Sequence, residues 1–213
     1  MIRCIYTPFT DIYFHLAAEE YLLKQGNENI FMLWQDTPSV VIGKHQRLRS
    51  EVDQEWAERE QVHVARRFSG GGAVYHDLGN VNLTFIETTP RLPEFVAYLQ
   101  RTLDFLNSMG LMATGGERLG IYLNGLKISG SAQCLHKNRV LYHCTLLYDT
   151  DNDDDCGKKP KKLYIHNPNL LNAVCLEDVD TTVLRKSFFL SQLCPMSRIT
   201  YTERADFLVD GKY

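Results

Sequence analysis

The chain has 213 residues, of which 44% are hydrophobic and 23% charged, and its formal net charge is -3. This composition excludes collagen-like, coiled-coil and intrinsically disordered proteins and argues against a nucleic-acid-coating protein, while a chain of this length buries about 70% of its extended surface and needs no metal or disulfide to fold. No apolar run approaches the ~20 residues of a membrane span and the N-terminus lacks a signal-peptide core, so we expect a cytoplasmic protein without nucleic-acid or membrane partners.

The first part of the chain predicts four strands and two helices. In chain order they span residues 2–6, 11–23, 30–34, 40–42, 51–61 and 62–68, the first helix being capped by Asp11. The third and fourth of these elements are joined by a short turn containing Pro38, which predicts a hairpin. Ser50-x-x-Asp53 resembles a capping box for the second helix.

The middle of the chain predicts a half-buried strand at 81–86, a helix at 93–110, a hairpin at 120–129 and a strand at 140–148. The helix carries Val96, Leu99, Leu103 and Leu106 on one face. Asn124-Gly125 is the strongest turn signal, because these residues accept the positive φ values of a type I′ turn. Hairpins with interspersed helices indicate an α/β (α+β) fold with a mixed, largely antiparallel sheet flanked by helices.

The segment Asp149–Lys162 is highly charged and has few apolar residues, so we expect a mobile loop at 149–162. Its Asp-x-Asp-x-Asp run does not form a calcium loop, because Cys156 and Lys162 occupy positions that require Gly and Glu. No metal site is assigned. The six cysteines form no C-x-x-C pair and are expected to be reduced thiols: Cys4, Cys134, Cys144, Cys156, Cys175 and Cys194.

The most informative stretch is Arg66–Asn80, in which three consecutive glycines follow a strand. Glycines are costly to order, so such a run is favoured where backbone must approach a ligand closely. Its N–H groups, with Arg66 or Arg67, can bind a carboxylate or phosphate. A plain tight turn between strands is the alternative, and the flanking Arg-Arg and His76-Asp77 pairs favour a site.

Two further candidates are Lys127, just beyond the predicted hairpin tip, and the pair His143-Cys144 in an apolar strand. A lysine near a turn is usually a solvated surface charge. Neighbouring strand residues point to opposite faces, so His143 and Cys144 are poor partners for each other. Neither a P-loop nor a Rossmann fingerprint is present.

Together, the segments Arg66–Asn80 and Lys127–Ala132, with His143-x-Thr145-Leu146-Leu147, resemble the lipoate-protein ligase A family. Additional matching pieces extend the resemblance over about residues 12 to 148: Ala17-Ala18-Glu19-Glu20, Val40 to Gln46 and Val52-Asp53-x-Glu55-Trp56. The resemblance implies the fold shared by biotin and lipoate ligases and class II aminoacyl-tRNA synthetases.

The resemblance also implies a two-step reaction. Lipoate and Mg-ATP form lipoyl-adenylate and pyrophosphate, and a lysine of a lipoyl domain then attacks the mixed anhydride. ATP, Mg²⁺ and lipoate are thus expected as substrates, with no tightly bound prosthetic group. The implied acceptors are lipoyl domains of 2-oxoacid dehydrogenase E2 subunits and the glycine cleavage H protein, and a separate small accessory chain is a further expected partner.

The resemblance assigns the catalytic role to Lys127, which would neutralise the carboxylate and the α-phosphate. The lipoate or adenylate site it implies comprises Arg67, Ser69, Gly70, Gly71, Gly72, Val74, Tyr75, His76, Asp77, Asn80 and His143. Arg118-Leu119-Gly120-Ile121 departs from the family's Arg-Asn-Asp-Leu, so Glu117 or Asn124 would have to supply a phosphate or magnesium contact. We expect one catalytic domain over 1–213 without a complete C-terminal accessory domain.

Two alternatives remain at this stage. One is an octanoyl or lipoyl transferase of the same fold, acting from an acyl-adenylate or through a thioester on Cys134 or Cys144. The other is a non-catalytic lipoate-binding protein. Pyrophosphate release that depends on lipoate separates the ligase from both.

Overall fold

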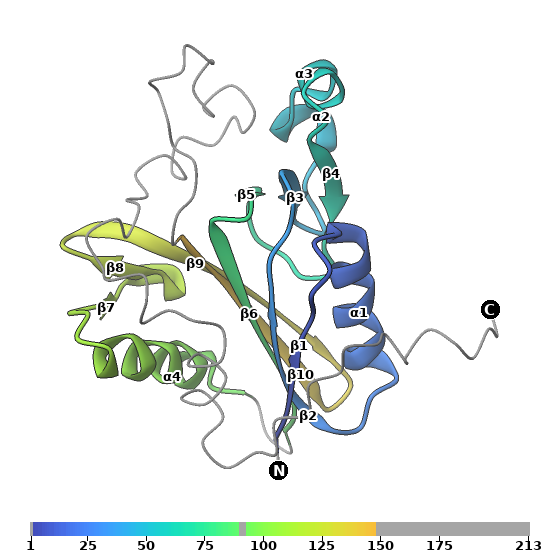
Figure 1. The fold of residues 1–213 in the computed structure, drawn as a ribbon. Coiled ribbons are helices and arrows are strands. Elements are labelled where there is room, and N and C mark those ends of the chain that lie inside the picture. Colours follow the sequence, from blue (N-terminus) through green and yellow to red (C-terminus); the bar gives the residue numbers. More distant parts are fainter. Residues whose placement is uncertain (1, 90–92, 148–213) are drawn as a thin grey trace.

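The computed structural model describes residues 2–89 and 93–147. They form a seven-stranded sheet and a three-stranded sheet with helices packed on them (Figure 1). The loop expected at 149–162 lies outside the described residues.

The elements follow in the order β1 (Ile2–Tyr6), α1 (Ile12–Lys24), β2 (Asn29–Trp34), β3 (Ser39–Ile42), α2 (Leu48–Glu51), α3 (Gln54–Arg59), β4 (His63–Arg66), β5 (Val74–His76), β6 (Asn80–Thr88), α4 (Phe95–Ser108), β7 (Thr114–Gly115), the 3-10 turn η1 (Glu117–Leu119), β8 (Ile121–Leu123), β9 (Leu126–His136) and β10 (Arg139–Leu147).

Both sheets contain parallel and antiparallel neighbours. The large sheet has the order β1-β2-β6-β10-β9-β8-β7, in which only β1 and β2 are parallel. In the small sheet, β3 lies between β4, to which it is parallel, and β5, to which it is antiparallel. The predicted mixed, largely antiparallel α/β architecture is confirmed.

The large sheet is buried on both faces, because α4 packs on one face and α1 on the other (Figure 1). Along β2, Phe31 and Leu33 join the cluster that contains α4, whereas Ile30 and Met32 join the cluster that contains α1. This two-sided burial explains why the β2 sequence is apolar at every position from Ile30 onward instead of alternating.

Local signals predicted two features correctly. Asp11 caps α1, its carboxylate accepting from the Tyr13 N–H at 2.8 Å. Asn124 and Gly125 have φ values of 50° and 79° and connect β8 to β9, as a type I′ turn requires.

The predicted hairpin of residues 30–34 and 40–42 is wrong. Both edges of β2 are already paired, with β1 and with β6, so no edge is open to β3. The turn at Pro38 instead carries the chain into the small sheet, where β3 pairs with β4 and β5.

The single helix predicted over 51–61 is also wrong. The chain forms α2 and α3, separated at Val52, which has extended backbone with φ -131° and ψ 132°. The Val52 side chain is buried in the cluster that covers the small sheet, and this burial interrupts the helix. Asp53 caps α3 by accepting from the Trp56 N–H at 3.0 Å, whereas Ser50 lies inside α2.

Two predicted burial patterns need correction. β6 is central in the large sheet, so its residues are mostly buried on both faces rather than alternating. Val96 is 62% exposed, and the buried face of α4 begins with Tyr98 and Leu99. The helical spacing of the apolar residues was predicted correctly, but the first turn of α4, which carries Val96, is not covered by the large sheet.

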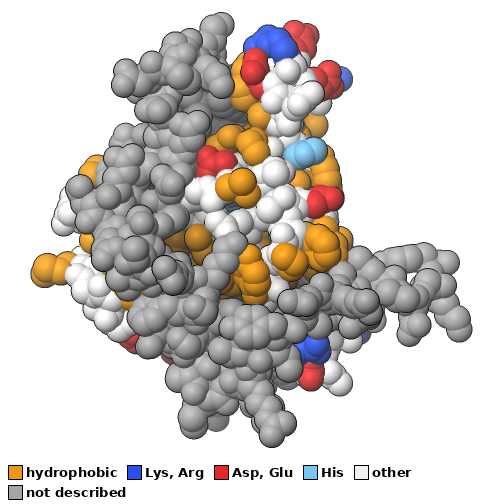
Figure 2. Space-filling model, viewed as in Figure 1, with side chains coloured by type: hydrophobic (Ala, Val, Ile, Leu, Met, Phe, Trp, Pro, Cys, Tyr) orange, Lys and Arg blue, Asp and Glu red, His pale blue; other side chains and the backbone are white. Residues whose placement is uncertain are grey.

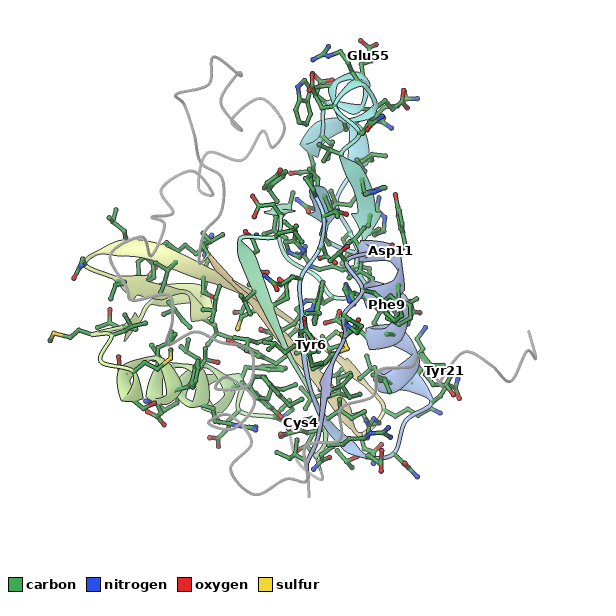
Figure 3. The ribbon with its side chains drawn as sticks, in the orientation of Figure 1. Cys4, Tyr6, Phe9, Asp11, Tyr21 and Glu55 are labelled. Atoms are coloured by element: carbon green, nitrogen blue, oxygen red, sulfur yellow. The ribbon has the colours of Figure 1, made fainter. Side chains whose placement is uncertain are left out.

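Charged side chains of both signs lie together on the end of the molecule formed by α2 and α3 (Figure 2). Glu55 is labelled at this end in Figure 3. Tyr21 lies on the side of α1 that faces away from the large sheet (Figure 3) and is 45% exposed. Among the helices in the described part of the chain, none has the length and apolar character needed to span a membrane.

Candidate functional site

The segment Ser69–Gly72, here called the glycine segment, follows β4 and is held by a buried arginine. Arg67 donates from Nε and Nη2 to the Gly70 carbonyl oxygen at 3.1 and 2.7 Å, and from Nη2 to that of Gly72 at 2.7 Å. Its Nη1 donates to the Val41 carbonyl at 3.1 Å. Burial lowers the pKa of Arg67 to about 10. Arg67 thus fixes the backbone of the segment, and its contact with a ligand stays a prediction.

A second arginine holds a turn directly against the glycine segment. Arg66 donates from Nη1 to the carbonyl oxygens of Gly43 at 2.9 Å and Gln46 at 2.8 Å. A Cβ placed on Gly43 would lie 2.1 Å from the Gly71 carbonyl oxygen. Only glycine lets the two loops lie so close.

The structure brings Ser69 and His143 together with an acidic residue from α1. The Ser69 Oγ lies 2.8 Å from His143 Nε2, and His143 Nδ1 lies 3.0 and 3.1 Å from the two carboxylate oxygens of Glu19. Ser69 and Glu19 are 1% and 3% exposed. A hydroxyl, an imidazole and a carboxylate in this order can polarise the hydroxyl and move a proton.

A buried polar network places His76. Asp36, in the turn after β2, accepts from His15 Nδ1 at 2.6 Å and from His76 Nδ1 at 2.8 Å. The other ring nitrogen of His76 lies 3.2 Å from Thr145 Oγ1 on β10. Burial raises the pKa of Asp36, but the hydrogen bonds and charges of the two histidines outweigh it and leave the pKa below its ordinary value of 3.8. These hydrogen bonds join α1, the small sheet and the large sheet, so they fix the relative positions of the elements that carry the site.

Replacing Asp36 with asparagine should destabilise the protein by about 3 kcal/mol near pH 7, because the amide keeps only one acceptor oxygen for two buried histidines and turns a donor NH₂ toward the other. The pKa of Asp36 is lowered in the folded protein, so its stabilisation is present above pH 3.8 and lost as the pH falls through the lower folded pKa. Urea unfolding should therefore show a gap between wild type and Asp36→Asn that narrows below that pH. Asp104→Asn, on the exposed face of α4, is the control. Equal stability of wild type and Asp36→Asn at pH 7 would contradict this role.

The predicted residues from Val74 to Asn80 lie on β5, in the turn that follows it and, for Asn80, at the start of β6. Val74 and Tyr75 are half-buried and pack on opposite faces of the small sheet. The Asn80 amide donates to the Tyr75 carbonyl at 2.8 Å, and Asp77 accepts from the Gly79 N–H at 2.9 Å. These bonds fix the turn, and direct contact of these residues with a ligand stays a prediction.

Lys127 lies at the start of β9, against a strained turn. Its Cε would be 3.3 Å from a Cβ placed on Gly120. Arg118 and Leu119, which directly precede Gly120, have φ values of 56° and 58°, and this backbone conformation costs free energy for residues that bear a side chain. The Ser131 hydroxyl holds the turn by donating to the Leu119 carbonyl at 3.0 Å. No described hydrogen bond or ion pair links Lys127 to the glycine segment, so their joint action stays a prediction.

Among the described cysteines, Cys4 departs from the expected reduced state, while Cys156, Cys175 and Cys194 lie outside the described residues. Cys134 and Cys144 are free, whereas Cys4 is disulfide-bonded, contrary to the expected reduced state. Burial raises the pKa of both free thiols to about 12, with Glu19 adding to the effect at Cys134. Neither is a good thiolate nucleophile at neutral pH. Within residues 2–89 and 93–147, no group of three or more His, Cys, Asp or Glu residues could hold a metal ion.

Sequence reasoning did not assign His15, Glu19 or Asp36 to the site. A signal for two of them existed, because His15 and Glu19 occupy the same helical face as Ile12, Leu22 and Leu23. A histidine and a carboxylate on an apolar face need buried partners. Asp36 stands in a turn, and only the tertiary structure shows its burial.

The sequence matches the family described as lipoyl protein ligase A/B catalytic domain over residues 11–167. It is 38% identical over 149 residues to lipoate-protein ligase 1 of Staphylococcus aureus, covering 68% of this chain and 45% of that protein. It is 38% identical over 148 residues to the human mitochondrial lipoyl amidotransferase, covering 66% of this chain and 39% of that protein. The chain therefore spans less than half the length of these two curated relatives.

Two solved structures share the fold. A lipoate-protein ligase A bound with ATP aligns with a TM-score of 0.78 at 23% identity, covering 96% of this chain and 89% of that chain. A bipartite lipoate protein ligase of Thermoplasma acidophilum, studied with its E2 lipoyl domain, aligns with a TM-score of 0.75 at 23% identity, covering 95% of this chain and 86% of that chain.

Proposed function

The chain belongs to the lipoyl protein ligase A/B catalytic domain family, and from this premise we propose that it is an ATP-dependent lipoate-protein ligase. It activates lipoate as lipoyl-adenylate and transfers the lipoyl group to a lysine of an acceptor lipoyl domain. The observation that carries the proposal is the family match over 11–167, which includes both the glycine segment and Lys127.

The activation step must bring two anions together, because the lipoate carboxylate attacks the α-phosphate of ATP. At ~4 Å their repulsion amounts to about 4 kcal/mol in a partly desolvated site. In the proposed mechanism the Lys127 ammonium neutralises both groups and follows the charge to the phosphoryl oxygens in the transition state. Mg²⁺ enters with the nucleotide as part of the substrate.

The glycine segment binds the acyl end of the adenylate in this proposal. Two features support the assignment: Arg67 holds the segment rigid, and Gly43 allows a second loop to back it closely. A rigid backbone presents its N–H groups to a carboxylate or phosphate without a further ordering cost.

The proposed acceptors are lipoyl domains of 2-oxoacid dehydrogenase E2 subunits and the glycine cleavage H protein. The fold shared with a bipartite ligase that was studied with its E2 lipoyl domain supports this class of partner, as well as a separate accessory chain.

A second candidate function is lipoyl transfer without activation of free lipoate. The 38% identity to a lipoyl amidotransferase favours it. Pyrophosphate release measured with ATP, Mg²⁺ and the full chain separates the two: a ligase releases pyrophosphate only when lipoate is added. Transfer of a preformed lipoyl-adenylate without such release would replace the ligase by the transferase.

We expect Cys144→Ala and Cys134→Ser, singly and together, to retain acyl transfer, because both thiols have pKa values raised to about 12 by burial. Mass spectrometry after acid quench should detect no acyl-cysteine. A trapped thioester, or loss of transfer in a folded variant, would favour a cysteine acyltransferase.

A further inference from the structure

A series of hydrogen bonds with a fixed order of donors and acceptors runs from the core to Ser69. It begins at Trp34, whose indole N–H can only donate and does so to Thr84 Oγ1 at 2.9 Å. The Thr84 hydroxyl therefore donates its hydrogen bond to the Glu19 carboxylate. The Glu19 carboxylate, which accepts from Thr84, also accepts the Nδ1–H of His143.

The direction of these hydrogen bonds places a proton on Nδ1 of His143. In the tautomer that carries only this proton, Nε2 presents a lone pair. The Ser69 hydroxyl, 2.8 Å away, donates to it. Ser69 thus resembles the polarised serine of a hydroxyl–imidazole–carboxylate triad, with Thr84 and Trp34 fixing the carboxylate.

The series of hydrogen bonds ends in the part of the molecule where acyl transfer is proposed to occur. A Cβ on Gly71 would lie 3.7 Å from the Ala132 Cβ, and Ala132 on β9 is the strand partner of His143 on β10. The polarised hydroxyl is therefore part of the same loop that, in the proposed function, lies along the acyl-adenylate. Because Ser69 is 1% exposed and the His143 side chain 12%, bulk water has little access to either.

We propose that Ser69, His143 and Glu19 form the proton relay of the transfer step, an inference that rests on the proposed function. The acceptor amine attacks the acyl carbon, a C–N bond forms, and the C–O bond to phosphate breaks with the electron pair leaving on AMP. The amine proton passes to Ser69 Oγ as the Ser69 proton passes to His143 Nε2. Glu19 stabilises the resulting imidazolium, which then returns its Nε2 proton through Ser69 to a phosphate oxygen of the departing AMP.

The relay predicts a specific defect for His143→Gln, whose amide can replace the hydrogen bonds but cannot take up a proton. Single-turnover transfer from synthetic lipoyl-adenylate to a purified lipoyl domain, at saturating adenylate, should slow at least ~100-fold. The affinity for the adenylate should stay at the wild-type value in His143→Gln, so that the defect lies in the rate of transfer and not in binding. His63→Gln, an exposed histidine on β4, is the matched control.

Three outcomes would overturn the relay: His143→Gln keeps the wild-type rate, it loses rate only together with affinity for the adenylate, or an acyl-Ser69 ester is trapped. The synthetic adenylate tests the relay even if the chain makes no adenylate. Failure of the wild-type chain itself to transfer from the adenylate would overturn the proposed function together with the relay.

Discussion

Replacement of Lys127 with alanine should abolish lipoylation of an acceptor domain while leaving the fold intact. Lys127 is half-buried at the start of β9, and no carboxylate within residues 2–89 and 93–147 forms an ion pair with it. Its ammonium is therefore available to an anionic substrate. Loss of about 4 kcal/mol of charge stabilisation corresponds to a rate decrease of about 1,000-fold.

The measurement is the rate of acceptor modification, with urea unfolding as the test of folding. Lys137→Ala, in the exposed turn between β9 and β10, removes an equal charge away from the site and should retain full activity. A Lys127→Ala variant that modifies the acceptor at the wild-type rate would remove Lys127 from the mechanism.

Replacement of Gly71 with valine should eliminate lipoate binding. Gly71 has φ +97°, a conformation that a β-branched residue rarely adopts, and an added Cβ would lie 2.8 Å from Arg67 Nη2. The side chain would displace the guanidinium that holds the carbonyls of Gly70 and Gly72. Calorimetry should show at least a ~100-fold loss of lipoate affinity, equivalent to about 3 kcal/mol.

Gly110→Ala, just after α4 and outside the glycine segment, provides the control, since Gly110 also has a positive φ of +87° and no atom lies within 4 Å of an added Cβ there. Gly71→Ala carries the same φ penalty with less bulk, and it keeps the test valid if the valine variant does not fold. A folded Gly71 variant that binds lipoate with unchanged affinity would refute the role of the segment.

The fold could be predicted where a local interaction decides the structure. Asn124-Gly125 defines its turn through backbone conformations that other residues avoid, and Asp11 caps its helix through a nearby N–H. The hairpin across Pro38 could not be excluded from sequence, because the choice of partner depends on β1 and β6. The break at Val52 likewise depends on a tertiary cluster.

The candidate site, like the fold, could be predicted from the sequence only in part. Ser69 and His143 could be proposed from motifs, and the structure places them 2.8 Å apart. The hydrogen-bonding partners of Arg67 could not be predicted, since an arginine beside glycines reads equally as a ligand contact or as support for the backbone. Glu19 carried a signal in the sequence, since it shares the apolar face of α1, but its partner His143 and the burial of Asp36 became visible only with the tertiary packing.

The most direct test of the ligase proposal is mass spectrometry of a purified lipoyl domain incubated with the full chain, ATP, Mg²⁺ and lipoate. We expect the acceptor to gain one lipoyl group on its lysine, only when ATP and lipoate are both present and not with the Lys127→Ala variant. An unmodified acceptor under the complete conditions, with a folded chain, would contradict the account.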